Sequence, residues 1–503
     1  MSTESTADAE TVFRKAQELA KNGEAEEAFR LYMEAAETGH PIAAYMVGQH
    51  YAVGAAVEKN ERESMFWTTY AATDGYVPAK GVVVNRLVRS DGPSDRNIFE
   101  YASGKAEAGS AAGMYIAGMC YDLAIGTDLD DGKAYEMFCR SADAGNLDGA
   151  CQKALCIIRG AGTARDKAAG AAMLKEISSK GNLRASLKYA WCLEHGVGTK
   201  RDPKAAFKIY SELADRKIPV AQYEVGRCYM DGVGVEKDAN MAYSWYLVAQ
   251  TVGCVEADYG MARCLMGGVG VNRNTEEGLK MLMSAAERGS VDAMVMLGQL
   301  YSKGRLVKKD ARKSFEWFKT AADLGNPFAE LTTGDNYSEG NGTSKDASLS
   351  FRYYLRAAVH GSTQGCHMAG SDLISGNGVK RDEEKGFRLC SMAAEDGYMK
   401  SMYIVANCYA HGRGVEKDSE KAFRLHMELA EKGYIKSQLY VGECYYHANG
   451  VGEDYAEARK WFEKGAKEEN LFCQYYMGDI YHNGRGVPKD DGKATEWYRK
   501  AAA

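Results

Sequence analysis

A repeating pattern of small residues runs through most of the 503-residue chain. A chain of this length exceeds what one hydrophobic core usually supports, so either several domains or a repeat array is expected. One position, which we call the anchor, is Gly or Ala in eleven successive repeats and recurs every 36 residues. These anchors are Gly118, Ala154, Ala190, Gly226, Ala262, Gly298, Gly334, Gly370, Ala406, Gly442 and Gly478. One shortened step of 34 residues extends the series back to Val84 and Gly48.

Each period predicts a helix, a turn and a second helix. Around the anchor Gly226, the residues Ala221, Val225 and Tyr229 share its helical face at spacings of three and four, which is typical of an amphipathic helix. A residue as small as Gly226 predicts close approach by a neighbouring helix. Gly232 follows as a helix-stopping residue that can adopt positive φ. The fold class expected is therefore an all-α solenoid of helix-turn-helix repeats.

A second set of equivalent positions in the repeat independently supports the register set by the anchors. The second helix of each period is preceded by a residue whose side chain can accept hydrogen bonds from the free N–H groups of the first helical turn. These predicted N-caps are Asn60, Ser94, Asp130, Asp166, Asp202, Asp238, Asn274, Asp310, Asp346, Asp382, Asp418, Asp454 and Asp490.

The domain organisation follows from the repeat. Residues 1–10 are polar and are expected to be disordered, and residues 11–40 predict a more polar helix pair that caps the N-terminal end. Residues 41–503 predict the solenoid, with one irregular repeat near 78–110 that contains the β-prone run Val82-Val83-Val84. We expect about fourteen helix pairs in all.

The repeat resembles a known family. The pattern Ala-x-x-x-Leu-Gly-x-x-Tyr-x-x-Gly-x-Gly-Val-x-Lys-Asp-x-x-Lys-Ala is similar to the Sel-one-like repeat, a relative of the tetratricopeptide repeat, from about residue 11 to 503. The resemblance implies a right-handed superhelix with a period of 36 residues. It also implies a non-enzymatic adaptor or scaffold that binds protein or peptide partners on its concave face.

Catalytic and metal-binding patterns are missing from the sequence. Seven of the thirteen cysteines share one column, two residues after the anchor, and equivalent helices roughly 10 Å apart would keep them beyond disulfide range. We expect small buried thiols at Cys120, Cys156, Cys192, Cys228, Cys264, Cys408 and Cys444. The sequence has no His-Glu-x-x-His, phosphate-binding loop or Gly-x-Ser-x-Gly motif, so neither a metal, a cofactor nor an enzyme is expected. A weak hydrolase, implied by cysteine-rich relatives, remains an alternative.

The net charge and the hydropathy of the chain limit the classes of partner that we expect. A formal net charge of −6, with a pI near 6.0, does not favour nucleic acid. No segment approaches the ~20 consecutive apolar residues that would cross a bilayer, so membrane insertion is not expected. The polar, acidic first ten residues lack a secretory signal pattern, and a cytoplasmic location is expected.

The resemblance and the helical phase place the partner-binding groove on the first helix of each repeat. The groove positions would be one and four residues after the anchor and three before it. Aromatic, arginine and apolar residues, types common at binding hot spots, gather there between residues 115 and 270. The predicted site residues are Tyr115, Met119, Leu155, Trp191, Tyr223, Arg227, Met230, Tyr259, Arg263 and Met266. We expect Arg227 and Arg263 to meet an acidic group of an extended or helical partner, although the tyrosines could instead pack between repeats.

The C-terminal end suggests an alternative hypothesis. The last predicted helix, 492–503, has no polar capping helix after it and leaves Trp497 and Tyr498 without an obvious cover. Either the solenoid ends associate into a homo-oligomer or the chain is truncated.

Overall fold

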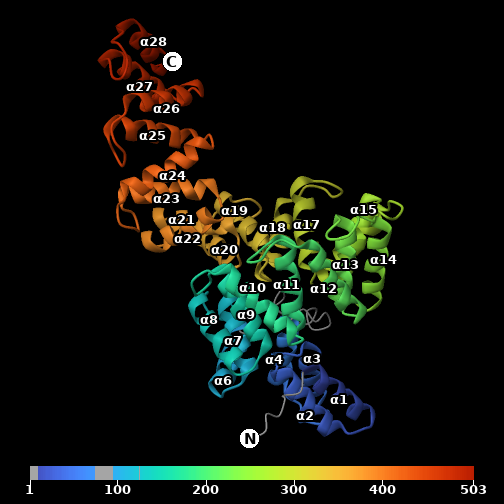
Figure 1. Ribbon diagram of the computed structural model, residues 1–503. Helices are drawn as coiled ribbons and strands as arrows, with labels where there is room; N and C mark the ends of the chain where they lie inside the picture. Colours follow the sequence, from blue (N-terminus) through green and yellow to red (C-terminus); the bar gives the residue numbers. More distant parts are fainter. Residues whose placement is uncertain (1–8, 74–93, 124, 503) are drawn as a thin grey trace. The chain divides into compact units, whose positions relative to one another are not determined.

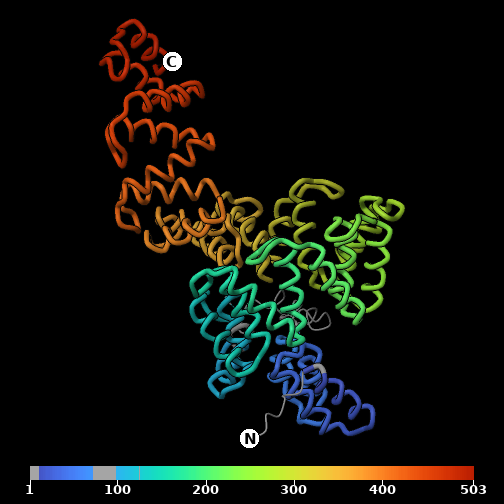
Figure 2. Tube along the Cα trace, in the orientation of Figure 1, coloured from blue at the N-terminus to red at the C-terminus, as the bar shows by residue number. Residues whose placement is uncertain are grey.

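The computed structural model describes residues 9–73, 94–123 and 125–502 and consists there entirely of helices and loops. Paired helices follow one another along the chain (Figures 1 and 2). The helices are α1 (Ala9–Lys21), α2 (Ala25–Glu37), α3 (Pro41–Val53), α4 (Glu61–Thr73), α6 (Ser94–Glu107), α7 (Ala111–Leu123), α8 (Asp131–Asp143), α9 (Leu147–Arg159), α10 (Lys167–Ser179), α11 (Leu183–His195), α12 (Pro203–Asp215), α13 (Pro219–Asp231), α14 (Ala239–Thr251), α15 (Val255–Gly267), α16 (Thr275–Glu287), α17 (Val291–Lys303), α18 (Ala311–Asp323), α19 (Pro327–Glu339), α20 (Ala347–Val359), α21 (Thr363–Ser375), α22 (Glu383–Glu395), α23 (Met399–His411), α24 (Ser419–Glu431), α25 (Ile435–His447), α26 (Tyr455–Lys467), α27 (Leu471–Asn483) and α28 (Asp491–Ala502).

This arrangement confirms the all-α solenoid of helix pairs. The first helix of each repeat, which carries the anchor, is odd-numbered from α7 to α27, and the second helix is even-numbered. The predicted N-terminal pair corresponds to α1 and α2. Val84 and about half of the expected irregular repeat lie outside the described residues; its remaining part forms α6, which is followed by α7.

The turn between α13 and α14 shows why the repeat needs its glycines. Gly232 has φ +76° and donates its N–H to the carbonyl of Cys228 at 2.8 Å, which ends α13. Gly234 has φ +70°, and a Cβ there would lie 2.0 Å from the carbonyl oxygen of Pro203 at the start of α12. The first glycine therefore serves the left-handed cap, and the second allows the loop to seat against the preceding repeat.

The predicted N-cap column is confirmed at twelve of its thirteen positions. The Asp238 carboxylate accepts hydrogen bonds from the N–H groups of Asn240 and Met241 at 2.9 and 3.0 Å. Equivalent bonds are made by Asn60, Asp130, Asp166, Asp202, Asn274, Asp310, Asp346, Asp382, Asp418, Asp454 and Asp490. The side chain of Ser94 is outside the described part of the chain.

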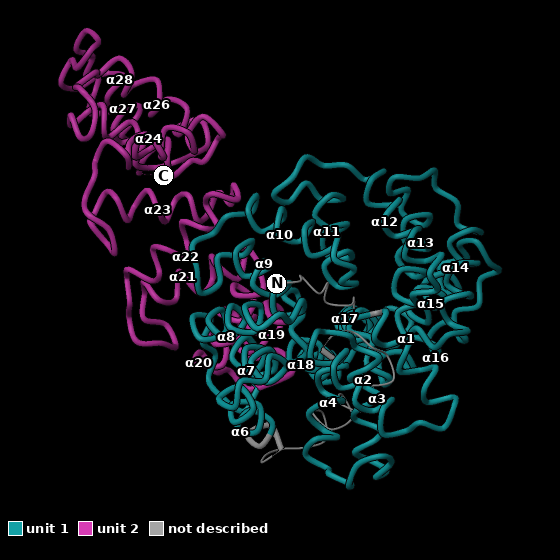
Figure 3. The backbone as a smooth tube through the Cα atoms, turned by 60° about the horizontal axis from the view of Figure 1, so that its bottom comes forward, with its two compact units in different colours: residues 1–329 teal, residues 330–503 magenta. Residues whose placement is uncertain are grey.

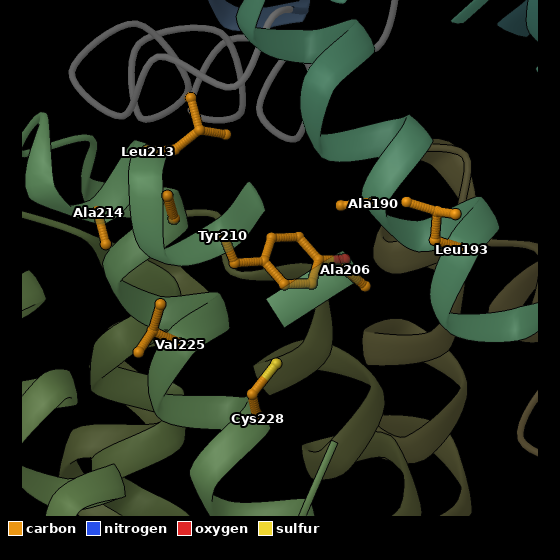
Figure 4. Packing of buried hydrophobic residues seen from close by; sticks show 9 residues of the cluster. Ala190, Leu193, Ala206, Tyr210, Leu213, Ala214, Val225 and Cys228 are labelled. Atoms are coloured by element: carbon orange, nitrogen blue, oxygen red, sulfur yellow. The ribbon is translucent and has the colours of Figure 1, made fainter. Parts of the chain in front are cut away.

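The anchor is small because the second helix lies directly over it. A Cβ on Gly226 would lie 2.6 Å from a ring carbon of Tyr246, and one on Gly118 would lie 2.6 Å from the ring of Phe138. Larger side chains from three helices then fill each core. Figure 4 shows one such cluster, in which the buried ring of Tyr210 on α12 lies among residues of α11 and α13 such as Ala190 and Val225.

The chain divides into two compact units, residues 1–329 and 330–503, which we call unit 1 and unit 2 (Figure 3). The repeat pattern gives no sign of this division. Within unit 1, a buried polar cluster joins α4 to α9 and α11. The carboxylate of the fully buried Asp148 accepts hydrogen bonds from the Tyr70 hydroxyl at 3.0 Å and from the Asn182 amide at 2.9 Å. Burial raises the pKa of Asp148, and the charge of Arg184 opposes that rise.

All thirteen cysteines are free thiols, and twelve are buried. The expectation of a column of buried thiols is therefore confirmed. Burial raises the pKa of Cys156 and Cys192 to about 11 and that of Cys228 and Cys444 to about 12. These buried thiols serve as packing groups, and their raised pKa disfavours the thiolate form.

Candidate functional site

The concave face of the solenoid is formed by the first helices. Direct contacts connect α7 with α9, α9 with α11, α13 with α15, α15 with α17, and α21 with α23. In a curved stack, elements on the inner side lie closer together than those on the outer side. The first helices therefore lie on the inner side of the stack.

Three of the ten predicted groove residues are buried. Tyr115 is fully buried, with its ring 4.9 Å from that of Tyr70 and its hydroxyl accepting a hydrogen bond from Arg184 at 2.6 Å. Tyr223 packs against Tyr246 on α14, and Met266 lies beside Gly278 on α16. The expectation that these three face a partner is corrected, because each of them packs against a neighbouring helix. At the equivalent positions of other repeats, Tyr259 and Met230 keep some exposure.

The other predicted residues keep some access to solvent. Met119, Leu155, Met230 and Tyr259 are half-buried. Trp191 on α11 is 44% exposed, and its ring stacks on His195 with centroids 4.7 Å apart. Arg263 on α15 is exposed and lies over the ring of Tyr259 at 5.6 Å.

Arg227 is held by two carboxylates of its own chain. Its Nη1 and Nη2 donate to the two oxygens of Glu194 at 2.9 and 2.6 Å, and its Nε donates to Glu224 at 2.7 Å. Burial alone would lower the pKa of Arg227, but the two carboxylates raise it. Burial raises the pKa of Glu224, and Arg227 opposes that effect. Arg227 is therefore already neutralised and is poorly suited to meet an acidic group of a partner.

Lys188 supplies a cation that the sequence analysis did not select. It lies on α11, one turn before Trp191, and keeps an exposed surface. Desolvation by the surrounding protein and the charge of Arg184 lower its pKa. Within the described residues, neither Lys188 nor Arg263 has an ion pair, so two uncompensated cations lie on either side of the neutralised Arg227.

The Glu194–Arg227 ion pair could have been predicted from the spacing of its residues in the sequence. The two residues are 33 positions apart, as are the partners of the Tyr446–Asp479 hydrogen bond in unit 2 and of the contact between Met119 and Gln152. This separation connects the first helix of one repeat with that of the next. A search for opposite charges at an offset of 33 would have found Glu194 and Arg227.

In unit 2, the first helices carry acidic residues on the concave side, and these carboxylates largely interact with other side chains of the chain. Asp479 accepts a hydrogen bond from Tyr446 and lies 3.8 Å from the Arg485 guanidinium. Burial raises the pKa of Glu443, while a hydrogen bond to Tyr476 opposes that rise. The large apolar side chains exposed among the described residues of this unit are Met399, Ile435, Leu471, Phe472 and Tyr475, the last three on α27. Trp497 and Tyr498, expected to lack a cover, are half-buried.

Over the residues described, no group of three or more His, Cys, Asp or Glu side chains is placed to hold a metal ion. No helix in the same part of the chain is both long and apolar enough to cross a membrane.

These observations define a solenoid of helix pairs with a concave first-helix surface. The chain belongs to the Sel1 repeat family: the Sel1 repeat matches residues 41–76, 111–146, 183–217, 219–249, 255–290, 291–326, 329–362, 364–398, 400–434, 435–470 and 471–503. The resemblance seen in the sequence is thereby confirmed. Helices α9 and α10, between two of these matches, have the same form.

Several solved structures are similar. The protein c5321, described as a protective antigen present in uropathogenic Escherichia coli with an SLR fold, is 22% identical over 94% of each chain, with a TM-score of 0.44. A Sel1 repeat protein from Oxalobacter formigenes is 26% identical over 60% of this chain and 89% of its own, with a TM-score of 0.40. The immunity protein Pa5087 from Pseudomonas aeruginosa is 19% identical over 43% of this chain and 82% of its own, with a TM-score of 0.24. No curated protein matches the chain. Family membership rests on the repeat matches.

Proposed function

We propose that the chain is a non-enzymatic scaffold that binds an extended protein segment on the concave surface of α11, α13 and α15. Sel1 repeats are typically protein-interaction scaffolds, which is the general basis of the proposal. The observation that carries the site is the exposed Trp191, one helical turn from the uncompensated Lys188. Tryptophan is prominent among residues whose truncation weakens protein complexes most.

The charges suggest the chemistry of the partner segment. Lys188 and Arg263 lie on first helices two repeats apart, so about 20 Å separates the helix axes that carry them at about 10 Å per step. An extended chain covers that distance with about six residues. We therefore infer a segment with acidic residues about six positions apart and an apolar side chain that meets Trp191. This replaces Arg227 by Lys188 as the cation expected to contact the partner.

The proposal is tested by affinity capture from native lysate with mass spectrometry, followed by titration calorimetry with the captured segment. Trp191→Ala is expected to raise the dissociation constant about 30-fold, equivalent to about 2 kcal/mol. Lys188→Glu and Arg263→Glu should each weaken binding and make it less sensitive to salt. Arg312→Glu reverses an exposed charge on the second helix α18 and is the matched control.

Each outcome has a distinct meaning. Loss of the same partners in the Trp191 and Lys188 variants, with retention in the control, supports the site. Capture of identical partners by all variants would place the binding surface elsewhere. If the wild-type chain captures no specific protein, the scaffold proposal itself fails.

A further inference from the structure

The loop between α17 and α18 in unit 1 carries an unusual concentration of positive charge. Residues 303–309 contain Lys303, Arg305, Lys308 and Lys309 and no acidic residue. All four side chains are exposed, and none of them forms an ion pair with another described residue. At the same register, the other loops from 123–129 to 483–489 have formal charges between −1 and +2.

The charged residues around this loop do not cancel the excess. They are Asp310, Arg312, Lys313 and Glu316 on the same hairpin and Arg273, Glu276, Glu277 and Lys280 on the preceding repeat. These four cations and four anions balance one another, and two of the pairs, Arg312–Glu316 and Lys280–Glu276, are in direct contact. In the sequence of the following repeat, the loop 339–345 is neutral, with Glu339 and Lys345. The four charges of residues 303–309 therefore remain in excess.

The same loop exposes an apolar side chain at a backbone position that favours glycine. Leu306 has φ +65° and is 49% exposed. At this register the other described repeats from α7 onward have a glycine with positive φ, at Gly126, Gly162, Gly198, Gly234, Gly270, Gly342, Gly378, Gly414, Gly450 and Gly486. A left-handed backbone is unfavourable for leucine, and backbone strain of this kind is concentrated at functional sites.

The side chain of Leu306 also changes how the loop sits. A Cβ on Gly234 or Gly270 would lie 2.0 or 2.2 Å from a carbonyl oxygen of the preceding repeat, that of Pro203 or Ala239. A residue with a Cβ cannot take that close position, so the loop at Leu306 lies farther from the preceding repeat. Val269, which directly precedes Gly270 in the equivalent loop one repeat earlier, is 40% exposed. This edge of unit 1 thus exposes two apolar side chains beside four cations in excess.

The residue types point to one class of anionic partner. Single-stranded nucleic acids are bound by stacking their bases on aromatic side chains, and residues 302–309 contain none. Leucine is under-represented among the hot spots of protein complexes. At an anionic bilayer, lysine and arginine attract the lipid headgroups while an apolar side chain enters the boundary of the acyl chains. The long stems of lysine and arginine can stay in that boundary with their charges in water.

We propose that the α17–α18 loop attaches this chain to the surface of an anionic lipid bilayer, with its four cations at the headgroups and Leu306 inserted between them. Such attachment does not require the chain to cross the bilayer. Since the whole chain has a formal net charge of −6, repulsion of its other surfaces orients this edge toward the lipid. This inference does not rest on the proposed concave binding site.

Co-sedimentation of the full chain with lipid vesicles measures the attachment. The wild type is expected to bind vesicles with about 30% phosphatidylserine in phosphatidylcholine, to ignore pure phosphatidylcholine, and to dissociate as salt increases. Lys308→Gln/Lys309→Gln should weaken binding about 25-fold, since each cation near the surface contributes about five-fold. The matched control is Lys380→Gln/Arg381→Gln, which removes two exposed cations at the same register two repeats later and should bind like the wild type.

Leu306→Gly tests insertion separately from charge. It keeps every cation and restores the residue of the other repeats, so the variant should fold normally. Binding to phosphatidylserine vesicles is expected to weaken about ten-fold with an unchanged dependence on salt, because only apolar burial is lost. Leu306→Met retains an apolar side chain and should bind like the wild type. Circular dichroism melting curves verify that each variant is folded.

A wild-type chain that binds neither kind of vesicle, or both equally, overturns the proposal. Equal weakening by the Lys308/Lys309 variant and the control overturns the assignment to this loop, and full binding by Leu306→Gly overturns insertion. Binding of a single-stranded RNA through Lys308 and Lys309 without binding to vesicles would assign the patch to nucleic acid instead. Displacement from vesicles by inorganic phosphate, beyond the effect of sodium chloride at equal ionic strength, would make a free anion the ligand and overturn the proposal.

Discussion

The Glu194–Arg227–Glu224 cluster gives a sharp prediction for stability. Arg227→Ala removes three charge-assisted hydrogen bonds and leaves Glu194, whose side chain is 7% exposed, without its cation. Removing one partner of a buried ion pair costs about 3–5 kcal/mol. The Arg227 side chain is 23% exposed, so water can replace part of the interaction. We therefore expect a loss of about 3 kcal/mol in the free energy of unfolding at neutral pH.

The pH dependence of this loss has a defined sign. Burial raises the pKa of Glu224 above its ordinary 4.5, and removal of Arg227 raises it further because the opposing cation is gone. For a carboxyl whose folded pKa is raised, stability is present below the unfolded pKa and is lost as pH increases through the folded pKa. The cost of Arg227→Ala is thus greatest at neutral pH and shrinks as the pH approaches about 4.5.

Urea denaturation followed by circular dichroism measures both effects, with wild type and variant compared at each pH. Arg263→Ala is the matched control, since Arg263 occupies the same register one repeat later without an ion pair among the described residues. Its loss should not exceed about 1 kcal/mol, the upper range for its contact with Tyr259. Glu194→Gln in the Arg227→Ala background should recover at least about 1 kcal/mol by removing a buried charge. Equal losses for both arginine variants, or a loss independent of pH, would refute the reasoning.

Three further predictions concern packing, backbone and thiols. Gly226→Ala is expected to destabilise the fold by about 1–2 kcal/mol in urea titrations, because contact with Tyr246 outweighs a gain of about 1 kcal/mol in helix propensity; a stabilised variant would contradict this packing. Leu306→Gly should raise the stability by up to about 1 kcal/mol, since Leu306 holds φ +65° where most repeats have glycine; an unchanged urea midpoint would count against strain there. With a thiol reagent at pH 8, at most about one of the thirteen thiols, Cys139, should react before unfolding, and rapid reaction of several would argue against their burial.

Much of the fold was readable from the sequence because each signal is local. The 36-residue period, the cap residues such as Asp238 and the loop glycines such as Gly232 act within one or two turns of the backbone. The cysteine column was also predictable, because a small apolar residue that recurs at the same position of many repeats indicates a packed position.

The candidate site was only partly predictable, because it depends on contacts between repeats. The sequence selected Trp191 and Arg263 from the resemblance and helical phase, and the structure leaves both side chains exposed. It left open whether Tyr115 and Tyr223 face a partner or pack between repeats, and it did not select Lys188, which stays exposed. The local pattern fixes which way a side chain leaves its own helix, but the neighbouring helix decides whether it is covered.

Arg227 shows the same division most clearly. Its position in the repeat determined that it lies on the concave helix surface, where an exposed arginine could meet a partner. The structure shows that this charge is already paired with Glu194, one repeat earlier, and with Glu224 on the same helix. Sequence fixes the periodicity and caps through short-range backbone geometry. Tertiary structure decides which charges and apolar faces remain unpaired, because burial and ion pairing depend on how adjacent repeats stack.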